Sequence, residues 1–87
     1  MSYADKVKGE VMAKVSLQVN TDKAQQYGWT DYTMEMLAGK IYDYYYKKGL
    51  VGEFLEMQVI STFNWYTGGH RVCRDMFELL MGIKEYR

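Results

Sequence analysis

The chain has 87 residues, of which 48% are hydrophobic and 25% are charged, with eleven basic and eleven acidic side chains. This length fits one domain with a single core, and the hydrophobic fraction excludes a disordered chain. The balanced charge gives neither the basic excess of a duplex-DNA-binding protein nor the acidic excess of a nucleic-acid mimic. We therefore expect one domain that comprises residues 1–87.

Hydropathy and cysteine content bear on where the protein resides. The first residues lack the uninterrupted apolar segment of a secretory signal, and no apolar run approaches the roughly 20 residues that cross a bilayer. The single cysteine, Cys73, cannot form a disulfide within one copy of the chain. These features predict a cytoplasmic protein that does not enter a membrane.

Two features of the sequence predict the fold class: the absence of proline and the spacing of the hydrophobic residues. The absence of proline favours helices joined by glycine turns over a loop-rich β fold. We therefore predict an all-α, small four-helix domain. Its hydrophobic periodicity places the helices near residues 3 to 18, 31 to 48, 51 to 67 and 70 to 84.

The predicted helix over residues 31 to 48 has the clearest boundaries. Thr30 can cap its first turn, and Gly49 can adopt the left-handed conformation that closes a helix. Trp29, just before the cap, is expected to fold back on the first turn as a hydrophobic staple. At about 100° per residue, one broad face gathers the predicted core side chains. These are Met34, Leu37, Ala38, Ile41, Tyr44, Tyr45 and the stem of Lys48.

A second stripe lies roughly 100° around the same helix and contains Glu35, Gly39, Tyr42 and Tyr46. Glycine inside a helix costs about 0.5 to 1 kcal/mol relative to alanine, so a close approach by another helix is a reason for Gly39. The two tyrosines either pack beneath a neighbouring segment of the same chain or contact another protein.

Two segments also fit a strand pattern. Residues 11 to 19 alternate hydrophobic and polar side chains, and residues 59 to 66 are rich in β-branched and aromatic side chains. A strand over the second segment, turning at Gly68 and Gly69, would give an α+β fold with a hairpin around residues 59–73. We favour helices, because an isolated strand would lack a partner.

The last two predicted helices carry more hydrophobic side chains than one core needs. Met57 and Ile60 lie on the far side of the third helix, and Phe77 and Met81 flank the core face of the fourth. The chain has seven methionines, and methionine-rich faces adapt to partners. The predicted protein-binding residues are therefore Glu35, Gly39, Tyr42, Tyr46, Met57, Ile60, Phe77 and Met81.

Side chains that could carry chemistry are few. His70 and Cys73 have the spacing of metal ligands, but the sequence has no other histidine or cysteine to complete a tetrahedral site. No nucleophile with a base and no paired carboxylates can be identified, so we predict no enzyme activity, catalytic residue, metal or cofactor. Cys73 is expected to point into the core and to be buried and inert.

One polar segment has features of an anion-binding site. Glycines that lead into a helix expose free amides, and neighbouring arginines can fork onto a phosphate or carboxylate. The segment lacks the strand, lysine and Ser/Thr of a phosphate-binding P-loop, so ordinary solvated arginines are the alternative. The residues concerned are Gly68, Gly69, His70, Arg71 and Arg74.

No motif identifies the function. We hypothesise a non-enzymatic protein-binding module that acts by surface contact. It would act as a homo-oligomer, or against a larger protein as an accessory or inhibitory protein of the type that viruses and mobile elements encode. The alternative is a single-stranded nucleic-acid or anion-binding protein, in which surface tyrosines and Trp65 stack on bases while Arg71 and Arg74 contact phosphates.

Overall fold

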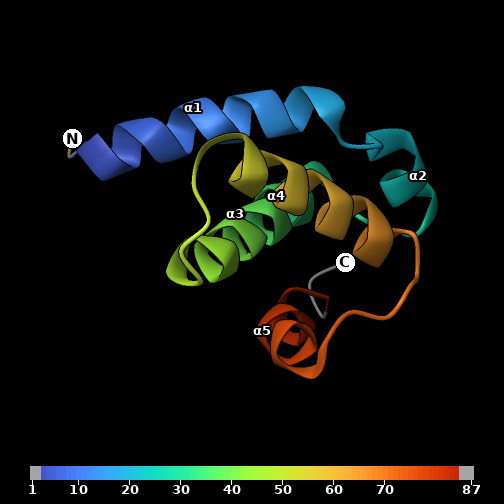
Figure 1. Ribbon diagram of the computed structural model, residues 1–87. Helices are drawn as coiled ribbons and strands as arrows, with labels where there is room; N and C mark the ends of the chain where they lie inside the picture. Colours follow the sequence, from blue (N-terminus) through green and yellow to red (C-terminus); the bar gives the residue numbers. More distant parts are fainter. Residues whose placement is uncertain (1–2, 85–87) are drawn as a thin grey trace.

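The computed structural model describes residues 3–84, and all regular structure in this range is helical (Figure 1). The all-α prediction is confirmed. Both segments with a strand-like pattern belong to helices, so the hairpin around residues 59–73 is wrong. The elements are α1 (Tyr3–Gln18), α2 (Thr21–Gln26), α3 (Asp31–Lys47), α4 (Gly52–Thr67) and α5 (Arg74–Lys84).

The described residues form five helices rather than four, because α2 lies between the first two predicted helices, where we predicted none. The side-chain oxygen of Asn20 caps α2 by accepting a hydrogen bond from the backbone N–H of Lys23, at 3.0 Å. Ala24 is fully buried, and α2 packs against α4. With only six residues, α2 is too short to show a hydrophobic period.

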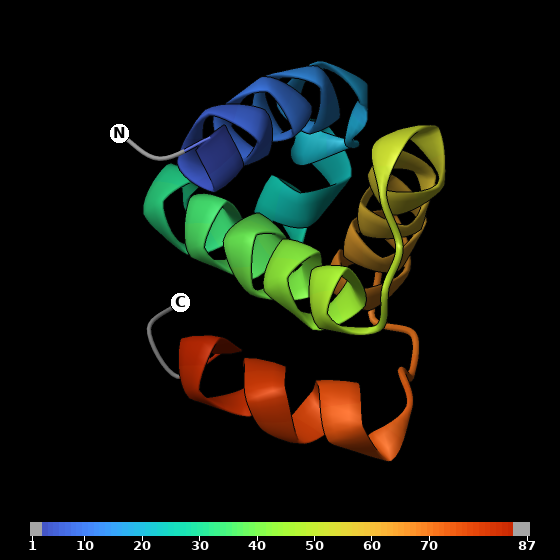
Figure 2. The same cartoon turned by 60° about the vertical axis from the view of Figure 1, so that its left-hand side comes forward.

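The central element is α3, against which α1, α4 and α5 all pack (Figure 2). A capping box starts it: the N–H of Thr33 donates to Thr30 Oγ1 at 3.2 Å, and the N–H of Thr30 donates to Thr33 Oγ1 at 2.9 Å. After its end, Gly49 adopts φ 96°, and its N–H donates to the carbonyl of Tyr46. The predicted start and stop signals of this helix are confirmed.

The core lies where α3 and α4 meet, and the other helices each contribute to it. Trp29, just before α3, is buried and meets the ring of Tyr66 edge to face, with centroids 5.8 Å apart. This contact ties the start of α3 to the end of α4. The buried hydrophobic residues are Val15, Ala24, Trp29, Met34, Leu37, Ala38, Ile41, Tyr42, Leu55, Val59, Phe63, Tyr66, Met76, Leu80 and Ile83.

The last helix, α5, begins at Arg74 instead of residue 70. The amides of Gly68 and Gly69 donate to the carbonyls of Asn64 and Tyr66, so the two glycines end α4 rather than begin α5. Residues 70 to 73 form an irregular loop, after which α5 runs back along α3 (Figure 2). Within residues 3–84, no helix is long and apolar enough to cross a membrane.

Candidate functional site

Tyr42, one of the predicted protein-binding residues, is only 3% exposed and belongs to the core. The reason is α1, which crosses α3 at this point. Lys8 Nζ lies 2.8 Å from Asp43 Oδ1 and 5.4 Å from the centroid of the Tyr42 ring. Of the two alternatives, packing beneath a segment of the same chain is confirmed for Tyr42, while Tyr46 stays exposed.

The other two members of that stripe have no helix packed on them. A Cβ added to Gly39 would meet no atom within 4 Å, so no described segment of the chain approaches it closely. Glu35 is exposed and lines a groove of about 430 Å³ between α1 and α3. The predicted reason for Gly39, close approach by a helix, is therefore not met by residues 3–84 of the same copy.

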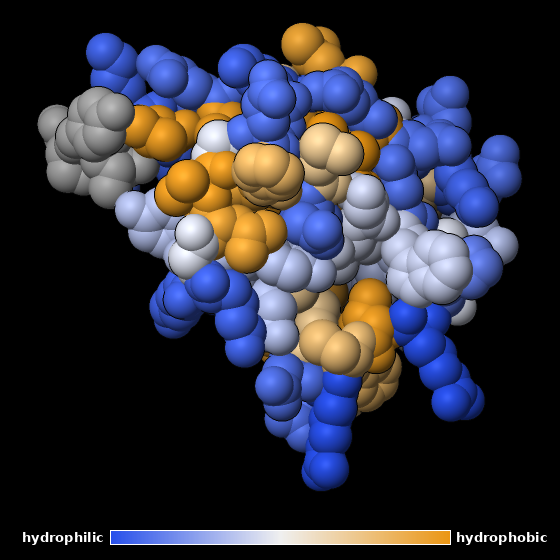
Figure 3. Space-filling model, in the orientation of Figure 1, coloured by the Kyte–Doolittle hydropathy of each residue, from blue (hydrophilic) through white to orange (hydrophobic). Residues whose placement is uncertain are grey.

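The outer face of α4 carries three exposed large hydrophobic side chains. Phe54 is 76% exposed, Met57 63% and Trp65 54%, and the exposed residues Gln58 and Ser61 lie between them. These five residues share one side of the helix because their spacing follows its turns, and we call them the α4 outer face. Figure 3 shows hydrophobic side chains gathered over the start of α4.

Trp65 is held in place at the end of this face. Its Nε1–H donates to the carbonyl of Arg71 at 2.6 Å, and its ring stacks on that of His70, with centroids 4.2 Å apart and planes inclined by 24°. The N–H of His70 donates in turn to the carbonyl of Trp65. A side chain that is already fixed loses little conformational entropy when a partner covers it.

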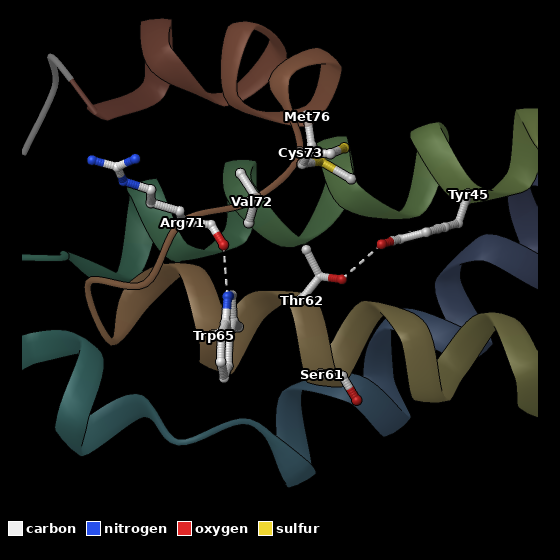
Figure 4. Close-up of a pocket in the computed structure, with 8 residues that line it drawn as sticks. All are labelled: Tyr45, Ser61, Thr62, Trp65, Arg71, Val72, Cys73 and Met76. Atoms are coloured by element: carbon white, nitrogen blue, oxygen red, sulfur yellow. Dashed lines mark hydrogen bonds between the residues drawn. The ribbon is translucent and has the colours of Figure 1, made fainter.

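A pocket of about 310 Å³ opens beside Trp65, between α4, the loop over residues 70 to 73 and the start of α5 (Figure 4). The hydroxyls of Tyr45 and Thr62 share a hydrogen bond of 3.0 Å, and the Trp65 indole is bonded to the loop. The pocket therefore offers mainly apolar surface. Its lining residues are Tyr45, Ser61, Thr62, Trp65, Arg71, Val72, Cys73 and Met76.

Cys73 is exposed, so the prediction of a buried thiol is wrong. The residue precedes α5 instead of lying inside it, and the helical wheel that aimed it at the core does not apply. Its Sγ lies 3.8 Å from the hydroxyl of Tyr44. This hydrogen bond is the largest cause that raises the pKa of Tyr44 above the ordinary tyrosine value. The partner of the thiol is thus a phenol rather than a base.

The predicted anion site is not preformed. The amides of Gly68, Gly69 and His70 all donate to carbonyls at the end of α4 and are not free for a ligand, so that part of the prediction is wrong. The side chains of Arg71 and Arg74 are exposed, and Arg74 Nε lies 3.4 Å from Glu78 Oε1 on the next turn. Anion binding by the two arginines stays a prediction.

The remaining predicted contact residues do not join the α4 outer face. Ile60 is half-buried. Phe77 and Met81 are 42% and 47% exposed on α5. Phe77 lines a separate hollow with Tyr66 and Thr67, which are buried residues of α4. The predicted protein-binding residues are therefore divided among three helices, α3, α4 and α5.

No protein-family model matches this sequence, and comparison with curated proteins and with solved structures gives no significant match. Among residues 3–84, no three His, Cys, Asp or Glu side chains cluster in a way that could hold a metal ion. The candidate site is therefore defined by its own geometry. Met57 was predicted to lie away from the core, but Phe54 was not among the predicted protein-binding residues. The spacing of Phe54, Ser61 and Trp65 was the signal that could have revealed the face.

Proposed function

We propose that this protein is a non-enzymatic protein-binding module whose contact surface is the α4 outer face. The observation that carries the proposal is the exposure of Phe54, Met57 and Trp65 on one side of one helix. Leaving apolar surface in water costs roughly 25 cal/mol per Å² relative to burying it. Hydrophobic side chains gathered on one exposed face are typical of protein-contact sites.

The chemistry of this face supports contact with protein. Tryptophan is among the residues that dominate interface energies, and Trp65 is fixed by its hydrogen bond to Arg71 and its stacking on His70. Phe54 and Met57 supply apolar area at the other end, where methionine adapts to a partner of irregular shape. In this role the protein acts by covering part of another protein surface.

The test compares Phe54→Ala with Leu17→Ala, because Leu17 is 86% exposed on α1 and lies outside the α4 outer face. The wild-type chain and both variants are immobilised, and the proteins recovered from an extract of the source cells are quantified, copies of the chain included. Circular dichroism first establishes that each variant is folded.

Truncation of an interface anchor typically costs about 2 kcal/mol or more, so Phe54→Ala should reduce specific recovery by more than roughly tenfold. Leu17→Ala should leave it unchanged. Equal recovery by all three chains would show that the α4 outer face is not the contact surface.

A second candidate function, binding of single-stranded nucleic acid, is favoured by one observation. The stacked rings of Trp65 and His70 lie beside the exposed Arg71, an arrangement that could stack a base and contact a phosphate. The balanced net charge works against it. The test measures the affinity for a labelled single-stranded oligonucleotide. An affinity that falls steeply with salt and is lost in Trp65→Ala would favour this function over protein binding.

A further inference from the structure

We infer that the α4 outer face binds the same face of a second copy of this chain, with the two α4 helices antiparallel across a two-fold axis. The inference rests on the proposed function and names the partner. A two-fold interface joins one patch to itself, so every contact occurs twice. The patch must therefore complement itself, both in shape and in charge.

The shape of the face meets this requirement. Phe54 and Trp65 stand eleven positions apart on one side of α4, or about 16 Å along the helix axis. Gln58 and Ser61 lie on either side of the midpoint between them. An antiparallel pair centred on that midpoint places Phe54 of each copy against Trp65 of the other. Aromatic pairs contribute about 0.5 to 1.5 kcal/mol beyond the area they bury.

The pocket beside Trp65 strengthens the match. Ser61 and Trp65 belong both to the α4 outer face and to the pocket lining, so a ring that reaches Trp65 from a second copy stands at the pocket mouth (Figure 4). Phe54 is the most exposed aromatic side chain of this face, at 76%. It is therefore the group that a second copy offers to the pocket, while the small side chain of Ser61 leaves room for close approach at the centre.

The charges favour the antiparallel direction. Of the two charged residues of α4, both acidic, Glu53 is exposed at its start, while Glu56 lies on the side toward α1 and accepts a hydrogen bond from Gln18 Nε2 at 2.8 Å. Basic residues lie at its end, where Lys23 packs against Gly68 and Arg71 accepts the Trp65 hydrogen bond through its carbonyl. Antiparallel pairing brings each acidic start to the basic end of the other copy. Parallel pairing would instead place Glu53 against Glu53.

Disulfide cross-linking tests the arrangement, in a Cys73→Ser background that removes the native thiol. Ser61→Cys places a thiol close to the axis, where the two copies approach within the roughly 7 Å between Cα atoms that a disulfide spans. Val51→Cys is the matched control: Val51 is 65% exposed just before α4, and its two copies would stand more than about 20 Å apart.

We expect the mass of the wild-type chain in solution to rise from monomer to dimer below roughly 1 mM. Under mild oxidation, Ser61→Cys should form an intermolecular disulfide at least tenfold faster than Val51→Cys, and adding Phe54→Ala should abolish that difference. A dimer in which Val51→Cys links as fast as Ser61→Cys would overturn the antiparallel arrangement.

A wild-type chain that stays monomeric up to roughly 1 mM would overturn the second copy as the partner. The proposed function is then decided separately by recovery from the extract. If the Phe54→Ala variant fails to recover proteins that the wild-type chain recovers, the α4 outer face binds a different protein, and only this inference is wrong. If recovery is also unchanged, both are wrong.

Discussion

Tyr42 and Tyr46 stack with ring centroids 5.8 Å apart and planes inclined by only 12°, yet one ring belongs to the core and the other to the surface. Tyr42 is 3% exposed and Tyr46 is 48% exposed. The difference arises because Lys8 of α1 lies over the Tyr42 ring. Two tyrosines one helical turn apart therefore have different roles in stability.

Truncating these two rings should separate their roles. Tyr42→Ala removes a buried ring and leaves a cavity, so we expect the free energy of unfolding to fall by about 3 kcal/mol. Tyr46→Ala should lower it by only about 0.5 kcal/mol, as is usual for a surface residue. Urea unfolding followed by circular dichroism measures both. Similar losses in the two variants would contradict the assignment of Tyr42 to the core.

The stability of the protein should decline in alkaline solution because of Tyr42. Burial raises the pKa of Tyr42 above the ordinary value of 10.0, and the charges of Tyr46 and Asp43 raise it further. Between the two pKa values the unfolded chain releases a proton that the folded chain keeps. The contribution of Tyr42 to the free energy of unfolding is thus fully present below about pH 10. It is lost as the pH rises through the higher pKa of the folded chain.

Urea unfolding at several pH values between about 8 and 11 would measure this decline in the free energy of unfolding. Tyr42→Phe keeps the buried ring but removes the ionisable group, so the free energy of unfolding should fall less steeply with pH than in the wild-type chain. Tyr32→Phe, at a tyrosine that is 68% exposed, is the control. The idea is wrong if Tyr42→Phe leaves the slope unchanged.

Gly39→Ala should stabilise the isolated chain. The added Cβ meets no atom within 4 Å, and alanine is favoured over glycine inside a helix by about 0.5 to 1 kcal/mol. Gly49→Ala is the opposite case, because Gly49 has φ 96°, where a side chain is strained. Thermal melting should show a higher midpoint for the first variant and a lower one for the second. A lower midpoint for Gly39→Ala would mean that this side of α3 has no space for a methyl group.

Cys73 should react with a thiol reagent in the folded protein. The thiol is exposed and has a phenol as its hydrogen-bond partner, so we expect one equivalent to react without denaturant. Absorbance of the released chromophore measures the reaction, with urea-unfolded protein as the reference for full access. Reaction only after unfolding would support the buried thiol that the sequence predicted.

Signals that act between sequence neighbours predicted the fold well. The cap at Thr30 and the left-handed glycine at Gly49 depend on groups within a few residues, so the boundaries of α3 could be read directly. Gly68 and Gly69 were ambiguous, because a glycine pair can end one helix or precede the next. The acceptors of their amides decide between these possibilities, and they lie in α4.

Burial was predicted less well, because it depends on segments far apart in the sequence. The wheel of α3 alone places Tyr42 beside the core, and Lys8 of α1, far away in the sequence, lies over its ring. Cys73 was misplaced because α5 starts at Arg74 instead of residue 70, so Cys73 lies just before the helix. The candidate site was predicted only in part: the exposure of Met57 followed from the wheel of α4. The fixed position of the Trp65 side chain could not be predicted, because it depends on the fold of the loop that contains Arg71.

The one-sided attachment of α5 sets the order in which the molecule opens. This helix packs mainly against α3, and the residues that it buries there are Met76, Leu80 and Ile83. Releasing it exposes less hydrophobic surface than separating α3 from α4, so we expect the amides of α5 to exchange with solvent before those of α3 and α4. Release of α5 alone would uncover a length of α3 that the closed molecule conceals, while the contact between α3 and α4 stays intact.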